Sequence, residues 1–285
     1  MITDLTSARE NFIVDLKKKG RSTSTILAYN KDVDQLIQFS AKQKISQPQE
    51  LTFTVIEAFK TSLTGDIYTA KSVSRKLNSI KTFCRFLVSL GLIKDNPAAG
   101  VTHPKYEIKP PRILSKMEYR SLRDVCREDI RLYAIVEILL QTGIRISELA
   151  NLKLEDIDTD KLDIKPFESH SRREVPLNKV AQAALSSYLK IRPNARVKQV
   201  FITKTGRPFL IRNIRTAIDR YFKIAGVKNA KVNDLRHTFI AHQLASGTPL
   251  TLISKLAGHK RLSTTEKYLE FITKPTASPA KLEEL

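Results

Sequence analysis

The stretch Thr142-Gly143-Ile144-Arg145-Ile146-Ser147-Glu148-Leu149 joins two apolar segments through a glycine and places an arginine just after it. Gly143 is expected to end one helix and Ser147 to help begin the next, so that Arg145 is held at the break. A guanidinium group in a fixed position can direct its planar fork at a phosphate, and Glu148 could orient it. An isolated arginine is more often part of a surface ion pair, so this interpretation depends on the rest of the chain.

Two later stretches carry a second arginine and a histidine at expected helix ends. Residues 233–238 (Asn-Asp-Leu-Arg-His-Thr) are expected to begin a helix at Arg236, which would supply the other half of a phosphate clamp. Residues 256–259 (Leu-Ala-Gly-His) contain Gly258, which lets the backbone turn tightly. His259 would then stand at a helix end, where its imidazole can reach a ligand. A single histidine is more often structural.

Tyr268 lies nine residues after His259, in residues 263–268 (Ser-Thr-Thr-Glu-Lys-Tyr), where Ser263 is a suitable N-cap. A tyrosine taken alone is usually a core or surface residue. A phenol is also a weak nucleophile, because its ordinary pKa is about 10. Preorganised cations beside a phosphate would stabilise the transition state of its attack, so the two arginines fit the role of catalytic partners.

The first hundred residues have the pattern of a compact helical domain. Apolar residues recur at helical spacing in four segments, of which the first ends at Gly20. A stretch with four prolines, 94–112, follows and is typical of a linker. We therefore expect a helical domain at 1–100, a linker at 101–112 and a second domain at 113–285. The four helices are expected at about 5–19, 22–42, 52–63 and 69–90.

The second domain combines further helices with one short sheet. Residues 162–164 and 174–177 are expected to form a β-hairpin around a polar turn at 166–172. The tail from Thr273 to Leu285 is polar except for Leu282 and Leu285, and it could fray or dock on a neighbouring protomer. The expected fold is therefore mainly α with a small β-sheet in the C-terminal domain. Its helices are expected at about 115–127, 129–142, 178–190, 211–225, 232–246, 249–257 and 263–272.

The composition points to a polyanionic partner. The formal net charge is +20 and the isoelectric point is about 9.9, so nucleic acid is the first partner to consider. Cys84 and Cys126 form no CxxC pattern, which argues against a disulfide framework or a zinc site and favours a reducing cytoplasm. We expect no membrane segment, because no apolar run approaches about 18 residues. No metal-ligand cluster or cofactor motif is recognisable.

Five basic residues are candidate phosphate contacts with DNA. In the fourth helix Lys71, Arg75, Asn78 and Lys81 follow one another three or four residues apart on one face. Arg212 and Arg215 lie near the start of a later helix. For each of these residues, a solvated surface face is an equally good interpretation.

Taken together and in this order, the motifs resemble the tyrosine recombinase, or phage integrase, family over nearly the whole chain. The set consists of Gly-x-Arg-x-Ser-Glu-Leu at 143–149, Leu-Arg-His at 235–237 and Gly-His followed by Tyr268. Residues 20–29 are similar to the start of the family's DNA-clamping helical domain, and the proline-containing linker falls where the family has one. The Xer-type recombinases and the resolvases or integrases of transposons are the most similar branches.

The resemblance implies a fold, a reaction and an assembly. Two domains would form a C-shaped clamp around double-stranded DNA. Tyr268 would attack a phosphate, leaving a 3′-phosphotyrosine and a free 5′-hydroxyl. A second 5′-hydroxyl would then attack the phosphotyrosine and reseal the strand. No cofactor or metal would be needed. Arg145, Arg236 and His259 would hold the phosphate, with Glu148 as the orienting residue. Four protomers would assemble on two recombination sites, to resolve or integrate a mobile element.

Two positions depart from the family pattern. Asn233 stands where the family has a histidine; it can donate a hydrogen bond to phosphate but cannot act as a general base. The hairpin lysine that would protonate the leaving 5′-oxygen is expected at about 167–169, where Glu168 is central. Lys165 is then the nearest candidate for this role, and His170 or Arg172 could also approach the phosphate.

Other functions remain open at this stage. A catalytically degenerate DNA-binding protein on the same scaffold would fit the departures at Glu168 and Asn233. An enzyme similar to type IB topoisomerases would use the same chemistry without strand exchange. An active recombinase explains best why both arginines, the histidine and the tyrosine occur together.

Overall fold

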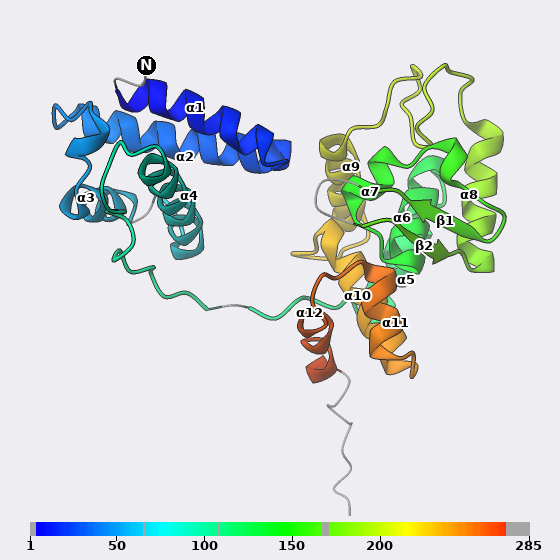
Figure 1. The fold of residues 1–285 in the computed structure, drawn as a ribbon. Helices are drawn as coiled ribbons and strands as arrows, with labels where there is room; N and C mark the ends of the chain where they lie inside the picture. Colours follow the sequence, from blue (N-terminus) through cyan, green and yellow to red (C-terminus); the bar gives the residue numbers. More distant parts are fainter. Residues whose placement is uncertain (1–3, 65–66, 108, 167–170, 272–285) are drawn as a thin grey trace, which may run out of the picture. The chain divides into compact units, whose positions relative to one another are not determined.

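The computed structural model describes residues 4–64, 67–107, 109–166 and 171–271. The chain divides into two compact units, Met1–Lys109 and Pro110–Leu285, which are treated separately below (Figure 1). Several positions used in the sequence predictions lie outside the described residues, namely Glu168, His170, Leu282 and Leu285.

The first unit is a bundle of helices around an apolar core. Four caps hold the helix starts, because the side chains of Asp4, Ser22, Thr52 and Thr69 each accept a hydrogen bond from a backbone amide three residues later. The core includes Phe12, whose ring packs edge-on against another buried phenylalanine ring. The elements are α1 (Leu5–Lys18), α2 (Thr23–Ala41), η1 (Pro48–Glu50), α3 (Phe53–Leu63) and α4 (Ala70–Ser89).

The packing of this unit continues past residue 100, where the linker was expected to begin. Val101 is buried in the core, and its carbonyl accepts a hydrogen bond from Lys81 Nζ at 2.8 Å. His103 Nδ1 lies 3.0 Å from Ser74 Oγ on α4. The first residues of the expected linker, up to His103, therefore pack with the first unit.

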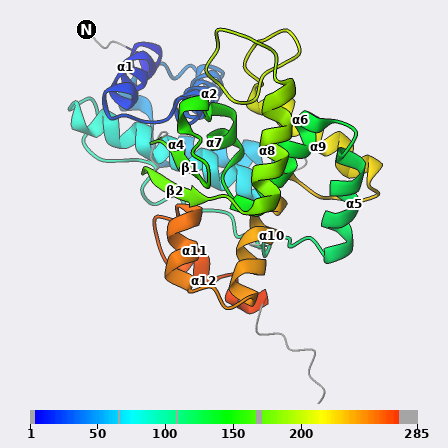
Figure 2. The same ribbon diagram turned by 90° about the vertical axis from the view of Figure 1, so that its right-hand side faces the viewer.

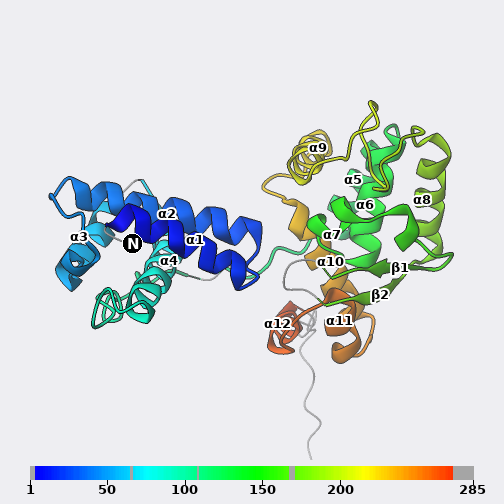
Figure 3. The same ribbon diagram turned by 45° about the horizontal axis from the view of Figure 1, so that its top comes forward.

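The second unit is built around helix α6 (Ile130–Thr142), which is buried over most of its length. Helices α5, α8, α9 and α10 all contact it (Figure 3). The remaining elements are α5 (Lys116–Cys126), α7 (Ile146–Asn151), η2 (Leu154–Asp156), α8 (Lys179–Ile191), α9 (Ile211–Ile224), α10 (Val232–Ala245), α11 (Leu250–Ala257), α12 (Ser263–Glu266) and η3 (Leu269–Phe271).

A two-stranded antiparallel sheet joins this bundle. Strands β1 (Lys161–Ile164) and β2 (Arg173–Pro176) pair in the expected hairpin, with Leu162 opposite Val175. Strand β2 also contacts α11, which brings the hairpin next to the helix that precedes His259 (Figure 2). The mainly helical fold with one small sheet is thus confirmed. Within the described residues, no helix combines the length and apolarity needed to cross a membrane.

Candidate active site

The break between α6 and α7 places Arg145. Gly143 adopts a left-handed conformation with φ of 63°, and a Cβ there would lie 2.2 Å from Cδ1 of Phe239. Only glycine fits this position without displacing the ring. Arg145 itself is the N-cap residue of α7, and its amide donates to Glu148 Oε2 at 2.8 Å. The expected helix-starting role of Ser147 was wrong, because Glu148 closes this first turn.

The Arg145 guanidinium is fixed by three acceptors. Its Nη1 donates to Glu148 Oε1 at 3.1 Å and to the Ala257 carbonyl at 3.3 Å, and its Nη2 donates to the Gly258 carbonyl at 2.9 Å. The expected orienting contact between Glu148 and Arg145 is therefore present. The two carbonyls belong to the end of α11, more than 100 positions further along the chain.

Helix α10 begins at Val232, in agreement with the helix expected at about 232–246, so Arg236 lies one turn inside it and is not its first residue. Its side chain is buried, with Nη1 donating to the Gly143 carbonyl at 2.5 Å and Nη2 to the Ala257 carbonyl at 2.6 Å. Burial, together with the nearby charge of Arg145, lowers the pKa of Arg236 to about 9. Among the described residues, no carboxylate lies within ion-pairing distance of it.

These carbonyls explain how like charges are held together. Gly143 caps α6 and Gly258 caps α11, and helix ends carry carbonyls without an intrahelical partner. The arginines donate to these dipoles, which fix the positions of the side chains without neutralising their formal charges. A guanidinium has five N–H donors, so Arg145 and Arg236 each keep donors beyond those used in these contacts.

Arg173 completes the cluster and was missed in the sequence analysis. From β2, its Nη1 and Nη2 donate to Glu148 Oε1 and Oε2 at 2.8 and 2.7 Å, and its Nε donates to the Leu256 carbonyl at 2.7 Å. Its place in the alternating strand, two residues before the apolar Val175, is a sequence signal for an inward-facing side chain. We call Arg145, Arg173, Arg236 and Glu148 the arginine cluster.

Glu148 is the single carboxylate of the arginine cluster. Burial alone would raise the pKa of Glu148, but the hydrogen bonds and charge of Arg173, with the Arg145 amide, lower it to about 2. The carboxylate is therefore ionised at neutral pH, and three guanidinium groups face one negative charge. Such a surplus of directed N–H donors suits a phosphate. No group of His, Cys, Asp and Glu side chains within the described residues could hold a metal ion.

Tyr268 is buried just after α12, with 5% of its surface exposed. Its Oη lies 2.6 Å from His237 Nδ1. Burial raises the pKa of Tyr268, and the positive charge of Arg236 partly opposes this. Ser263 does not cap α12 as expected, because the N-cap position is Leu262 and no side chain caps the helix, which ends at Glu266.

His259 follows the left-handed Gly258, as expected from the sequence. Its Nδ1 lies 2.7 Å from Oγ1 of the buried Thr265. Its ring is stacked on Tyr268 at 6.5 Å between centroids, with 16° between the planes. Burial and the charges of Arg236 and Arg145 lower the pKa of His259 to about 4, so this imidazole is neutral at pH 7.

Three further residues considered for the active site, Lys165, Arg172 and Asn233, take part in none of the hydrogen bonds described above. Lys165 Nζ pairs with Asp156 Oδ1 at 2.6 Å and with Glu155 Oε1 at 3.3 Å. Arg172 Nε pairs with Asp163 Oδ1 at 2.9 Å. Asn233 is exposed at the start of α10.

The candidate DNA contacts differ in their surroundings. In the first unit Arg75 binds Asp32 through two hydrogen bonds of 2.5 and 2.9 Å, while Lys81 donates to the Val101 carbonyl. Both side chains are thus partly engaged within the unit, whereas the neighbouring Lys71 is exposed. In the second unit two exposed arginines lie three residues apart near the start of α9, namely Arg212 and Arg215.

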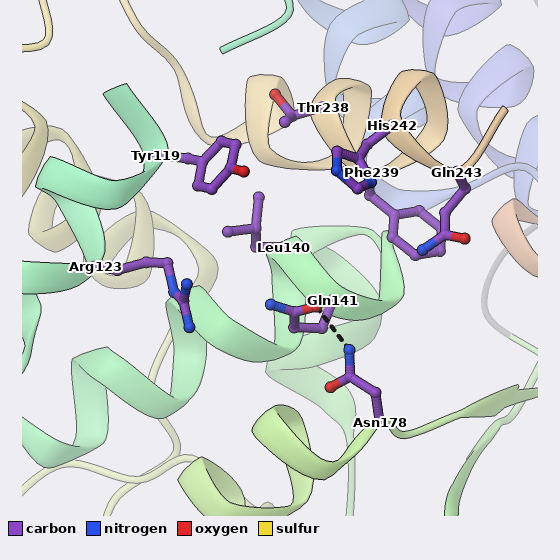
Figure 4. Close-up of a pocket in the computed structure, with 9 residues that line it drawn as sticks. All are labelled: Tyr119, Arg123, Leu140, Gln141, Asn178, Thr238, Phe239, His242 and Gln243. Carbon is purple, nitrogen blue, oxygen red and sulfur yellow. Dashed lines mark hydrogen bonds between the residues drawn. The ribbon is translucent and has the colours of Figure 1, made fainter. Parts of the chain in front are cut away.

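A pocket of about 290 Å³ opens elsewhere on α10 (Figure 4). It is lined by α5, α6 and α10 together with Asn178, whose side chain donates to Gln141 Oε1 at 2.7 Å. Thr238 and Phe239 on α10 line it, directly after Arg236 and His237 in the sequence. Of the described residues around this pocket, none is a predicted catalytic residue.

Comparison with known proteins identifies relatives over most of the chain. Residues 112–273 match the phage integrase family, and residues 10–91 match the phage integrase N-terminal SAM-like domain. The chain is 34% identical over 276 residues to tyrosine recombinase XerC of Thermodesulfovibrio yellowstonii, with 90% of this chain and 89% of that protein covered. It is 31% identical to tyrosine recombinase XerD of Rickettsia bellii, with 90% and 92% covered.

Solved structures give the same result for the fold. The crystal structure of XerA recombinase is 27% identical with a TM-score of 0.52, covering 92% of each chain. A lambda integrase dimer bound to a COC′ core site has a TM-score of 0.76 at 17% identity, covering 92% of this chain and 97% of that one, which shows a shared fold. The chain belongs to the phage integrase family and is a tyrosine recombinase.

Proposed function

We propose that this recombinase cleaves double-stranded DNA by attack of Tyr268 on a backbone phosphate, leaving a 3′-phosphotyrosine and a free 5′-hydroxyl. A 5′-hydroxyl of the second site then attacks the phosphotyrosine and reseals the strand. The phosphate ester bond is exchanged and not lost, so the reaction needs no external energy source. The supporting observation is the surplus of fixed cations around Glu148, together with the charge of Arg236, which acts to lower the pKa of the buried Tyr268.

In this proposal the two arginines with spare donors bind the non-bridging oxygens. Arg145 and Arg236 are held by backbone carbonyls, so they need no rearrangement when negative charge develops on phosphorus. Arg173 positions Glu148, and Glu148 positions Arg145. His259, oriented by Thr265, keeps its second ring nitrogen for a phosphate oxygen. Asn233, exposed at the start of α10, is proposed as a further donor to the DNA backbone.

Lys165 is the proposed donor of a proton to the leaving 5′-oxygen. Its hydrogen bond to Asp156 raises its pKa, which keeps the ammonium protonated until it is needed. The ion pairs with Asp156 and Glu155 would have to open when DNA binds. A 5′-thiolate leaving group needs no proton, so a DNA substrate with a bridging 5′-sulfur should restore cleavage by Lys165→Ala. A defect that persists on this substrate would remove Lys165 from the role.

DNA binding is proposed to use both units, a helical one at 1–100 and a catalytic one at 113–285 around the linker. Lys71, Arg75 and Lys81 would contact phosphates from the first. From the second, Arg212 and Arg215 would do so, and the double Arg212→Ala, Arg215→Ala variant should lower the slope of log affinity against log salt by roughly 1.8. Arg127→Ala, at a mainly exposed arginine of the same unit, is the matched control. An unchanged slope in the double variant would contradict the assignment.

We further propose that four protomers act together on two DNA sites of a mobile element. The lambda integrase tetramer bound to a Holliday junction has the same fold, with a TM-score of 0.73 at 18% identity. Deletion of residues 275–285 should impair pairing of two sites more than binding to one, as gel-shift titration would reveal. Equal losses would contradict a role of the tail between protomers.

A covalent trapping experiment tests the cleavage proposal. The substrate is a nicked suicide duplex that carries the element's own repeats. Wild type should form a denaturant-resistant protein–DNA adduct, and Tyr268→Phe should not, because the phenylalanine has no oxygen to attack phosphorus. Tight binding without any adduct from wild type would favour the catalytically degenerate alternative.

A further inference from the structure

The hydrogen bond between Tyr268 and His237 is not explained by the phosphate-binding residues described above. The Tyr268 Oη and the His237 Nδ1 are 2.6 Å apart, within the range in which a proton can pass directly. His237 directly follows Arg236 in α10, so one helix turn presents a cation to the phosphate and an imidazole to the phenol. The ring centroids are 5.8 Å apart and tilted by 38°.

The second histidine beside Tyr268 is less suited to take its proton. The His259 ring lies nearly parallel to the phenol ring with 6.5 Å between centroids, and among the described hydrogen bonds none joins it to Tyr268 Oη. Its Nδ1 is already engaged with Thr265 Oγ1 at 2.7 Å. The carboxamide of Asn233 cannot accept a proton at neutral pH. Of the described side chains, His237 alone has a basic nitrogen in hydrogen-bonding contact with the Tyr268 hydroxyl.

The charges around His237 favour its neutral form. Burial lowers the pKa of His237, and the positive charge of Arg236 adds to this, while Asp234 on the same helix acts in the opposite direction. Among the described residues, His259 and Tyr268 face it from outside α10. A neutral imidazole with its proton on Nε2 presents Nδ1 as an acceptor to the phenol.

We propose that His237 is the general base that activates Tyr268, an inference that rests on the proposed role of Tyr268 as the nucleophile. The Oη–H bond breaks and its proton moves to Nδ1, giving an imidazolium. The freed electron pair forms the Oη–phosphorus bond, and the bond from phosphorus to the 5′-oxygen breaks. That oxygen takes its proton from the general acid, proposed above to be Lys165. In resealing, the imidazolium returns its proton to Oη as the tyrosine leaves.

The test measures single-turnover adduct formation on the nicked suicide duplex for wild type, His237→Asn and His242→Asn. Asparagine keeps a hydrogen-bond acceptor near the Nδ1 position but cannot take the proton. We expect His237→Asn to cleave about 100-fold more slowly or worse at pH 7, with unchanged DNA affinity. His242→Asn, the same change five residues later on α10, should cleave at the wild-type rate. A loss below tenfold in His237→Asn would overturn the proposal.

The dependence on pH and leaving group separates a general base from a structural role. Hydroxide can replace the missing base, so the deficit of His237→Asn should shrink between pH 7 and pH 9.5. It should also persist on the bridging 5′-sulfur substrate, because the nucleophile still has to lose its proton. A deficit that is constant with pH, or that the sulfur abolishes, would overturn the assignment.

Wild type alone provides a second measurement if His237→Asn does not fold. Its cleavage rate should rise to a plateau above the lowered pKa of His237, and a rate that still climbs in proportion to hydroxide up to pH 9 would contradict a general base. The two proposals fail in different ways. No Tyr268-dependent adduct in wild type would refute the proposed function, whereas a normal adduct with an unaffected His237→Asn refutes only this inference.

Discussion

Each unit of the chain buries charged side chains, but the two units balance that charge differently. In the first, the carboxylate of Asp32 accepts hydrogen bonds from Arg75, Lys76 and Ser79, so the cations there donate mainly to an anion. The arginine cluster of the second has one carboxylate, Glu148, for three guanidinium groups, and much of their hydrogen bonding goes to backbone carbonyls.

The difference teaches how to distinguish a structural cluster from a binding site. A buried cation paired with a carboxylate has its charge compensated within the fold. A buried cation held by neutral carbonyls is fixed in place, but its charge is not compensated. For this reason burial and the neighbouring Arg145 lower the pKa of Arg236. The second arrangement gains stability when an anion such as a DNA phosphate enters, whereas the first does not.

The largest expected effect on stability lies in the first unit. Asp32→Ala would leave Lys76 buried without its carboxylate, which we expect to lower the free energy of unfolding by about 3–5 kcal/mol. Asp34→Ala, two residues away on α2 at a partly exposed ion pair with Arg9, should cost about 1 kcal/mol or less. Denaturant titration measures both. Equal losses of unfolding free energy in the two variants would show that the buried ion pairs of Asp32 contribute no more to stability than the partly exposed ion pair of Asp34.

The corresponding change in the second unit should act on catalysis. Arg236→Ala removes a fixed donor to the phosphate and should slow single-turnover cleavage by about 100- to 1000-fold, equivalent to about 3–4 kcal/mol. Arg236→Lys should not restore it, because an ammonium cannot reach both carbonyls and the phosphate with the same geometry. Arg127→Ala, at a mainly exposed arginine, should cleave normally. A cleavage rate of Arg236→Ala less than tenfold below wild type would contradict the role of Arg236 as a fixed donor to the phosphate.

A smaller effect of pH should mark Glu148. Because its pKa in the folded state is about 2 and its ordinary value is 4.5, it contributes stability above about pH 4.5 that is lost as the pH falls towards 2. The difference in unfolding free energy between wild type and Glu148→Gln should therefore shrink by roughly 3 kcal/mol over this window. A difference that does not change with pH would show that Glu148 does not carry the charge balance of the arginine cluster.

The sequence predicted most of the fold because local signals agreed with packing. The caps at Ser22 and Thr69, and the glycine ends at Gly143 and Gly258, mark where helices begin and end. The helix after His259 was expected at about 263–272, but α12 already ends at Glu266. Ser263 is a good capping residue in isolation, but the N-cap position of α12 is Leu262 and no side chain caps the helix.

The site was predictable only in part, because motif residues and their partners come from distant segments. The motif positions pointed to Arg145, Arg236, His259 and Tyr268, which the structure brings close together. The contacts of Arg173 depend on how β2 meets α7 and α11, and that of His237 with Tyr268 on how α10 meets the segment after α12, which no local pattern encodes. The hairpin residues were placed by analogy with the family, and Lys165 proved to be ion-paired with Asp156.

The most direct test of the central claim is to identify the residue that becomes linked to DNA. The trapped adduct would be digested with protease and nuclease, and the peptide that carries the residual nucleotide would be sequenced by tandem mass spectrometry. The chain contains 8 tyrosines, and the account predicts that the 3′-phosphate is attached to Tyr268 alone. Attachment to any other residue, or an adduct that survives in Tyr268→Phe, would contradict it.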